Sequence, residues 1–216
     1  MKGKLITFEG PDFSGKSTQI KKLMSELKNS KVLYTREPGS YLPESSYYCE
    51  EIRDKILNNS LTPLEEAELF ADSRYEHTKE IVKYINEGFN VICDRYIISS
   101  LAYQGYAQNL GKDVIYELNG PTIDLLEENL LSIYAFRFKI SEEEWKKRKE
   151  ERLKKENADS IESKNIYDKV FEFYNNDSIY YDYTNKLNLF THTIDANKSI
   201  YELYKYINDM IQIFIR

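Results

Sequence analysis

Residues that build metal sites and disulfide frameworks are scarce in this chain. Its 216 residues include two cysteines and two histidines. Cys49 and Cys93 lie far apart and form no C-x-x-C pair, and neither His77 nor His192 belongs to a ligand cluster in the sequence. A zinc site is therefore disfavoured. Because so few thiols are typical of a reducing compartment, we expect a cytoplasmic protein.

Long apolar runs and an excess of positive charge are also absent. No run approaches the roughly 20 apolar residues of a membrane-spanning helix. The first residues, with Lys2, Lys4 and Glu9 around a short apolar stretch, do not follow the pattern of a signal peptide. We expect no membrane association. The formal net charge of −6 argues against a nucleic-acid-binding protein, so any anion must be held by a local pocket.

Strand-like and helix-like segments alternate along the chain. Apolar, β-rich runs fall at 4–8, 32–35, 89–93, 131–140 and 189–194. Helical periodicity covers the segment that ends near 27, then 44–57, 62–88 and 96–127 with breaks near Gly111 and Gly120, and the segments that begin near 141, 166 and 200. This alternation predicts an α/β fold with a parallel sheet, helices on both faces, and ligands at the carboxyl ends of the strands. Without a repeat or linker, residues 1–216 are predicted to form one domain.

Two of the predicted helices begin with capping boxes. Thr62 and Glu65 form one, with Pro63 in the first helical turn. Ser141 and Glu144 form the other, at the start of a highly charged helix.

Residues 10–17, with the sequence GPDFSGKS, fit the pattern G-x-x-x-x-G-K-[ST] of a phosphate-binding loop. The loop follows a predicted strand and opens a predicted helix, which is the setting that the pattern requires. Its glycines let backbone amides converge on phosphate oxygens, Lys16 reaches the β- and γ-phosphates, and the Ser17 hydroxyl can bind Mg²⁺. The pattern indicates binding of ATP or GTP and does not identify the acceptor. The residues assigned to this nucleotide are Gly10, Ser14, Gly15, Lys16, Ser17 and Thr18.

Asp94 and Arg95 come directly after the third predicted strand, where an open α/β sheet has its cleft. Asp94 can hold a water molecule on Mg²⁺, and the planar fork of Arg95 can bind a phosphate. If a helix starts near residue 96, two neighbouring rows offer hydrogen-bonding groups for a ligand: Arg95, Ser99, Ser100, Tyr103 and Gln104. The alternative places Tyr103 in the core and Gln104 in solvent.

Phe70 and Arg74 lie one turn apart on the apolar stripe of their helix. A buried guanidinium without a partner is very costly, so Arg74 must meet a carboxylate, carbonyl groups or a ligand. An aromatic ring beside a forked donor suits a nucleobase, which is stacked on its face and hydrogen-bonded at its edge. Pairing of Arg74 with an acidic residue is the alternative.

One face of the charged helix carries Trp145, Arg148, Arg152 and Lys155, which recur at helical spacing. A solvated helix is the usual meaning of such a run, and the pairs Glu143/Lys147 and Glu144/Arg148 favour it. In a kinase, however, an arginine-bearing lid stabilises the transferring phosphoryl group.

Taken together, these motifs resemble those of the thymidylate kinase family, of the bacterial kind. The similarity runs over nearly the whole chain: FEGPDFSGKST at 8–18, TREPG at 35–39, EEIRDKIL at 50–57, F-x-x-x-R at 70–74, VICDRYIISSLAYQG at 91–105 and HTIDA at 192–196. The resemblance implies transfer of the γ-phosphoryl group of ATP to dTMP with Mg²⁺ held at Ser17 and Asp94. It also implies a P-loop NTPase-type three-layer sandwich with a five-stranded parallel sheet, a lid at about 142–163, and a homodimer.

The resemblance also implies roles for the acceptor residues. Asp12 would hold the 3′-hydroxyl of the sugar, and Arg36 and Arg95 would hold the monophosphate. Phe70 would stack on thymine, while Tyr103 would lie under the sugar and disfavour a 2′-hydroxyl. The remaining residues assigned to dTMP are Arg74 and Ser100 at the base edge, with Gln104 and Ser99 nearby.

The sequence departs from the family pattern at the loop, the rim and the lid. Phe13 stands where some members have a catalytic arginine, so that role passes to Arg148 and Arg152, beside Lys16 and Arg95. Other changes are Gly39-Ser40 for Gly-Gly, the stretch 106–109, Phe138-Lys139 for Leu-Asp, and the lid motif at 159–162. Two alternatives stay open: a kinase of another nucleotide or a deoxynucleoside, and a weakly catalytic nucleotide-binding regulator, which only the altered lid motif supports.

Overall fold

A computed structural model describes residues 2–27, 31–156 and 161–215. Its centre is a five-stranded, all-parallel sheet in the order β2-β3-β1-β4-β5. The strands are β1 (Leu5–Glu9), β2 (Val32–Arg36), β3 (Asn90–Asp94), β4 (Ile133–Lys139) and β5 (Leu189–Asp195). The predicted parallel sheet and its five strands are confirmed. Because β1 lies between β3 and β4, the segments that follow these three strands meet at one edge.

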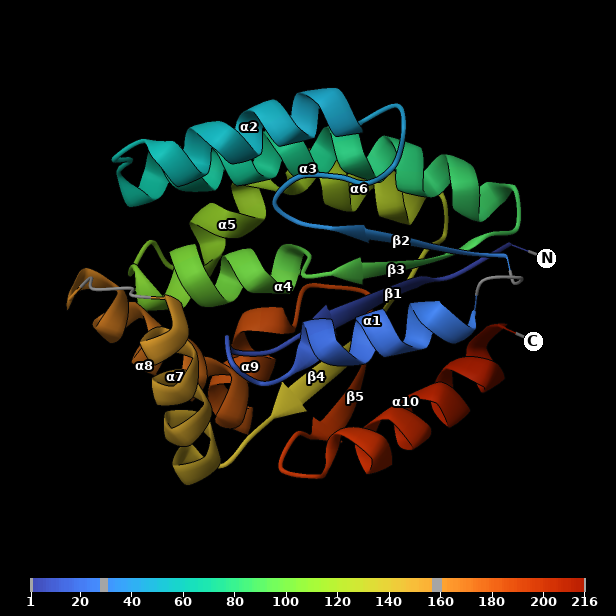
Figure 1. Ribbon diagram of the computed structural model, residues 1–216. Helices are drawn as coiled ribbons and strands as arrows, with labels where there is room; N and C mark the ends of the chain where they lie inside the picture. The colour runs from blue at the N-terminus through green and yellow to red at the C-terminus, as the bar shows by residue number, and fades with distance from the viewer. Residues whose placement is uncertain (1, 28–30, 157–160, 216) are drawn as a thin grey trace.

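Helices cover both faces of the sheet (Figure 1). One face packs against α1 (Lys16–Glu26) and α10 (Ile200–Ile215). The other packs against α3 (Pro63–Asn86), against which α2 (Ser46–Asn58) lies, and against a group of shorter helices. These are α4 (Ile97–Ser100), the π-helix η1 (Leu101–Ala107), α5 (Lys112–Leu118), α6 (Gly120–Glu128), α8 (Ile161–Asn175) and α9 (Asp177–Thr184). None of the helices described is both long and apolar enough to cross a membrane.

The alternation of side chains in the central strand explains the two cores. Leu5 of β1 contributes to the core under α3, whereas Ile6 and Phe8 contribute to the core under α1 and α10. Successive side chains of a strand point to opposite faces, so a strand covered on both sides has to be apolar at almost every position. The prediction that β3 is buried on both faces is confirmed for Asn90 to Cys93.

The helical region after β3 differs in detail from its prediction. The breaks near Gly111 and Gly120 are present, but residues 101–107 form a π-helix, which the sequence pattern did not indicate. Gly105 lies within it, and a Cβ there would come within 3.2 Å of Ile115. A π-helical segment rotates the side chains that follow it relative to an α-helix, and such segments are frequent at functional sites.

The second predicted capping box is only half correct. The Glu144 amide donates to the Ser141 hydroxyl at 3.4 Å, as expected. The Ser141 amide, however, donates to Asn197 Oδ1, and the Glu144 carboxylate accepts from Arg148 Nε at 2.8 Å. The charged helix, α7 (Glu142–Glu156), is therefore held at its start by the loop after β5.

The capping box of α3 is complete, and it gives a stability prediction. The Glu65 amide donates to Thr62 Oγ1 at 3.3 Å, and the Thr62 amide donates to Glu65 Oε2 at 2.8 Å. We expect Thr62→Ala to lower the free energy of unfolding by about 1 kcal/mol. The Glu65 amide loses its acceptor, and the reciprocal bond from the Thr62 amide to Glu65 loses its support. Thr62→Ser is the matched control and should stay near the wild type in urea unfolding. Equal stability of the two variants would contradict this role.

Candidate active site

The phosphate-binding loop connects β1 to α1, so it lies at the carboxyl edge of the sheet (Figure 1). Gly15 precedes α1 with a φ of 91°, in the left-handed region that favours glycine. At Gly10 a Cβ would approach Phe138 Cβ of β4 to 2.8 Å, closer than side chains tolerate. The two glycines of the motif are thus needed for the backbone turn and for packing of the loop against β4.

Lys16 is 5% exposed and turns back into the loop. Its Nζ donates to the carbonyl oxygens of Gly10 and Pro11, both at 2.9 Å. Burial and the neighbouring charge of Arg95 lower the pKa of Lys16 to about 8, although Asp12 opposes the shift. The ammonium group therefore lies in the concave side of the loop, where its predicted task is to meet phosphate oxygens.

Ser17 and Asp94, the two predicted Mg²⁺ ligands, are in direct contact. Ser17 Oγ donates to Asp94 Oδ2 at 2.9 Å, which joins the start of α1 to the end of β3. One hydroxyl and one carboxylate at the loop fit Mg²⁺, a hard cation that prefers oxygen ligands and takes several of them from phosphates and water.

Arg95 connects the loop to the segment after β3. It adopts a φ of 70°, forms an ion pair with Asp12, and donates to Gly10 O at 3.2 Å and to Ser99 Oγ at 3.3 Å. The second oxygen of the Asp12 carboxylate accepts from the Tyr103 hydroxyl at 2.7 Å. Burial would raise the pKa of Asp12, but the charges of Arg95 and Lys16 hold it below its ordinary value. An ionised carboxylate and a guanidinium thus lie side by side at the loop.

Arg74 is 1% exposed and makes three directed hydrogen bonds. Its Nε donates to Glu37 Oε2 at 2.7 Å, Nη1 to Asn119 Oδ1 at 2.6 Å, and Nη2 to Ser100 Oγ at 2.9 Å. The alternative that Arg74 pairs with an acidic residue is therefore correct for this structure, and the predicted neighbour Ser100 is present too. Glu37 and Asn119 were not among the predicted residues, because their contacts with Arg74 cross 37 and 45 positions of sequence.

Phe70 and Gln104 flank this polar cluster. Phe70 is half-buried one helical turn before Arg74. Gln104 is 2% exposed, and its Nε2 donates to Glu66 Oε1 at 3.2 Å, so the alternative that places it in solvent is wrong. Tyr103 is half-buried against the core, as the alternative expected, and its hydroxyl donates to Asp12. It therefore belongs to the core and also offers a polar group at the site.

Arg36 lies at the end of β2 beside a second arginine that the prediction did not assign. Arg36 binds the Glu50 carboxylate at 2.8 Å and donates to Pro38 O at 3.2 Å. Arg53 of α2 donates to the same carbonyl oxygen at 2.9 Å. Burial and the charge of Arg36 lower the pKa of Arg53, as expected for adjacent cations. A pair of neighbouring guanidinium groups attracts an anion, and the motif at 50–57 contained the signal for the second one.

Comparison with known proteins identifies the family to which this site belongs. A family model described as "Thymidylate kinase" matches residues 8–204, which include all the groups above. The chain belongs to the thymidylate kinase family. It is similar to proteins named "Thymidylate kinase" from Geobacillus sp. (strain WCH70), Lactobacillus acidophilus and Bacillus cereus.

The extent of these similarities differs from one relative to the next. Identity to the Geobacillus protein is 41% over 180 residues, covering 81% of this chain and 82% of the relative. Identity to the L. acidophilus protein is 42% over 137 residues, covering 60% of this chain and 61% of the relative. Identity to the B. cereus protein is 46% over 125 residues, covering 55% of this chain and 58% of the relative. The alignments with the last two relatives thus cover about three fifths of their length.

Of the two predicted lid arginines, Arg148 reaches the phosphate loop. It donates to Ser14 O at 3.3 Å and to Ala196 O at 3.0 Å, while Glu144 accepts from its Nε. Arg152 lies one turn farther along α7 with an exposed side chain. Residues 159 and 160 of the motif at 159–162 fall outside the described residues, as do residues 157–158 of the predicted lid and the Lys155 side chain. The pair Glu144/Arg148, which favoured a solvated helix, is present, but Arg148 also contacts the loop.

Glu9 is a buried acid that the sequence analysis missed. It ends β1, is fully buried, and accepts from Tyr96 N at 2.8 Å, Ser99 Oγ at 2.7 Å and Tyr174 Oη at 2.9 Å. Burial raises the pKa of Glu9 to about 7 despite these donors and the charge of Arg95. A signal was available, since an acid inside an apolar strand beside the loop requires compensation.

The raised pKa of Glu9 predicts a pH dependence of stability. Because the folded state holds a proton on Glu9 up to about pH 7 and the unfolded state releases it near 4.5, stability is lost as the pH rises between these values. From pH 5.5 to 7.5 the loss should be about 2 kcal/mol.

The test is urea unfolding at both pH values. Glu9→Gln cannot ionise, so its loss of stability over this range should be smaller than that of the wild type by the same amount. Glu68→Gln, an exposed change on α3, is the control and should retain the wild-type dependence. An unchanged dependence in Glu9→Gln would show that Glu9 is already ionised at pH 5.5.

Proposed function

We propose that this chain transfers the γ-phosphoryl group of ATP to dTMP, giving dTDP and ADP, the phosphorylation that leads towards dTTP. The observation that carries the proposal is the contact between Asp12 and Arg95. It joins a phosphate-donor loop to the segment that holds the acceptor groups, so donor and acceptor sites share an edge. Membership of the thymidylate kinase family supports the same reaction.

On the donor side, the loop would bind ATP with the residues of its motif. Backbone amides of the loop and the start of α1 offer donors to phosphate oxygens, and Lys16 supplies positive charge. The assigned residues are Gly10, Ser14, Gly15, Lys16, Ser17 and Thr18. Mg²⁺ would be held through Ser17 and Asp94, whose Oγ and Oδ2 atoms are 2.9 Å apart. When bound, it would neutralise negative charge on the phosphates.

On the acceptor side, the three parts of dTMP would meet three sets of groups. Its phosphate suits the guanidinium groups of Arg36 and Arg95, and we add Arg53 because it shares the Pro38 carbonyl with Arg36. The sugar would lie at Asp12 and Tyr103. The base would stack on Phe70, with the remaining assigned residues at its edge or nearby: Arg74, Ser99, Ser100 and Gln104.

The chemistry requires positioning more than a strong base. A monophosphate is already largely ionised near neutral pH, so it attacks without giving up a proton to the protein. What the chain supplies is alignment of the two phosphates and positive charge around the transferring group from Lys16, Arg95 and Arg148, with Arg152 as a second lid arginine. Closure of the lid over the site would exclude water, which prevents hydrolysis of ATP.

The contact of Arg148 with the loop favours catalysis over a purely regulatory role, whose only support is the altered lid motif. We also propose that residues 1–216 act as one nucleoside monophosphate kinase domain with its lid at about 142–163. A homodimer and a cytoplasmic location complete the proposal and are carried by the resemblance and by the composition.

A panel of acceptors tests the proposed reaction. ADP release with saturating ATP and Mg²⁺ should be fastest with dTMP, slower with dUMP, and near background with dAMP, dGMP and thymidine, since the base edge and the phosphate are both recognised. Faster turnover of another nucleotide or of thymidine would favour the other-kinase alternative. ATP binding without turnover of any acceptor would favour the regulator.

The role of Arg95 gives a second test. Arg95→Ala should reduce kcat/KM for dTMP about 10³-fold, since a charge-stabilising arginine is lost, while ATP binding measured by calorimetry changes little. Lys186→Ala, which removes an exposed partner of Asp113, is the control and should leave both quantities unchanged. Wild-type turnover in Arg95→Ala would rule out the assigned site of the acceptor phosphate.

A further inference from the structure

Two helices contact three consecutive residues of the phosphate loop: α7, which lies in the predicted lid, and α8, which begins in the lid and continues beyond it. Trp145 Nε1 of α7 donates to the carbonyl oxygen of Asp12 at 2.9 Å. The ring of Phe13 meets the ring of Tyr167 on α8 edge to face, with centroids 5.5 Å apart. Arg148 Nη1 donates to the carbonyl oxygen of residue 14 at 3.3 Å. The lid is therefore joined to the loop by two hydrogen bonds and one aromatic contact.

Trp145 is the centre of this contact region. It is the only tryptophan of the chain and is 2% exposed. Its ring lies 4.7 Å from that of Phe171 on α8, and the ammonium group of Lys149 lies 4.5 Å from its centroid. Packing of this kind fixes the rotamer of the indole, so its single N–H points at one acceptor.

Phe13 has a backbone conformation that an aromatic residue rarely adopts. Its φ is 67°, in the left-handed region where a Cβ is unfavourable. A residue in this conformation persists only where its surroundings stabilise it. The ring contact with Tyr167 is a contribution of that kind, and it comes from α8 rather than from the loop.

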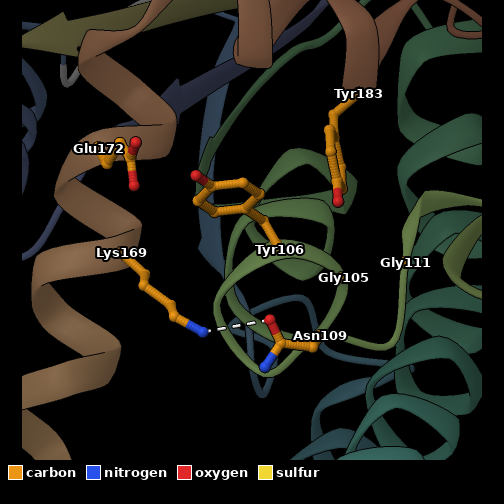
Figure 2. Close-up of a pocket in the computed structure, with 7 residues that line it drawn as sticks. All are labelled: Gly105, Tyr106, Asn109, Gly111, Lys169, Glu172 and Tyr183. Atoms are coloured by element: carbon orange, nitrogen blue, oxygen red, sulfur yellow. Dashed lines mark hydrogen bonds between the residues drawn. The ribbon is translucent and has the colours of Figure 1, made fainter.

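The same lid helix also contacts the helix that carries the acceptor groups. Figure 2 shows Lys169 of α8 pointing at Asn109, with the Tyr106 ring between α8 and Tyr183. Lys169 Nζ donates to Asn109 Oδ1 and to the carbonyl oxygen of Ala107, both at 3.1 Å. Lys169, Asn109, Tyr106 and Tyr183 line a cavity of about 290 Å³. Helix α8 thus lies against η1 through Lys169 and against the loop through Tyr167.

We propose that Trp145, Phe13 and Tyr167, here named the lid anchor, are positioning residues that set the lid on the phosphate loop. Through the anchor, Arg148 is held where the transferring phosphoryl group would pass. Asp12 couples the two sides, because its carbonyl oxygen binds Trp145 while its carboxylate binds Arg95 and Tyr103. This inference rests on the proposed phosphotransfer.

Three variants test the anchor. Trp145→Phe keeps a ring and removes the N–H. Phe13→Asn removes the ring but suits a left-handed backbone. Tyr167→Leu keeps apolar volume and removes the aromatic edge. Tyr206→Phe is the matched control, since it deletes one hydroxyl that bonds His192 at 2.6 Å, on α10 and away from the lid.

Each variant is measured for kcat and KM with ATP and dTMP and for thermal stability. We expect each anchor variant to lower kcat about tenfold with KM values near the wild type, because misplacement of a charged group by a fraction of an ångström affects the reacting state most. Phe13→Asn should do so without loss of thermal stability. In Phe13→Asn and Tyr167→Leu, acrylamide should quench Trp145 fluorescence more strongly, whereas Tyr206→Phe should match the wild type in every measurement.

The possible outcomes separate the anchor from the proposed reaction. Wild-type kcat in Phe13→Asn together with unchanged quenching of Trp145 would overturn the anchor and leave dTMP phosphorylation intact. A fall in kcat that only parallels a fall in thermal stability would mean a structural role and would also overturn it. If the wild type does not turn over dTMP, the proposed function fails, and the quenching measurements alone decide whether the rings hold the lid. Should Trp145→Phe not fold, the other two variants decide.

Discussion

The ion pair between Asp12 and Arg95 determines how the two halves of the site face each other. Phe8 and Asp94 are register partners in adjacent strands, and the amide of Arg95 donates to the carbonyl oxygen of Phe8 at 3.1 Å. The segments that follow β1 and β3 therefore leave the sheet side by side. Both side chains are partly withdrawn from water, and their pairing and the hydrogen bonds around them offset the hydration that they lose. The phosphate loop and the acceptor segment are thereby fixed relative to each other.

Other buried polar groups depend on the same compensation. Arg74 is neutralised by Glu37 and further bonded to Ser100 and Asn119, while Glu9, whose pKa burial raises to about 7, accepts hydrogen bonds from Ser99 and Tyr174. Arg137 on β4 is fully buried, and it forms an ion pair with Asp177 and lies 3.9 Å from the Tyr180 ring. Each of these side chains bonds to residues of another helix, strand or loop. These buried polar contacts therefore specify which helices lie against which strands. Networks of this kind select one arrangement because a shifted element would leave a charge without a partner.

The lid shows how an altered loop residue changes the surrounding packing. With an aromatic ring at position 13, the loop offers an apolar surface, and the ring of Tyr167 on α8 lies against it. Arg148 brings a positive charge to the loop from α7, where it donates to the carbonyl oxygen of Ser14. Charge and ring packing are thus contributed by different helices, since Arg148 lies on α7 and Tyr167 on α8.

The sequence by itself determined the alternation of strands and helices along the chain, the phosphate loop and the capping box at Thr62. It also determined that Asp94 and Arg95 follow a buried strand next to the polar residues of the next helix. These features depend on local periodicity and on motifs of fixed spacing. Only the tertiary structure decided the partners of Arg74, the burial of Glu9, the π-helix at 101–107 and the contact of Trp145 with Asp12. These depend on residues that lie far apart in the chain, such as the 133 positions between Asp12 and Trp145. A buried charge or an orphan N–H predicts that a partner exists, since burial without one is too costly, but the chain fold alone decides which residue it is.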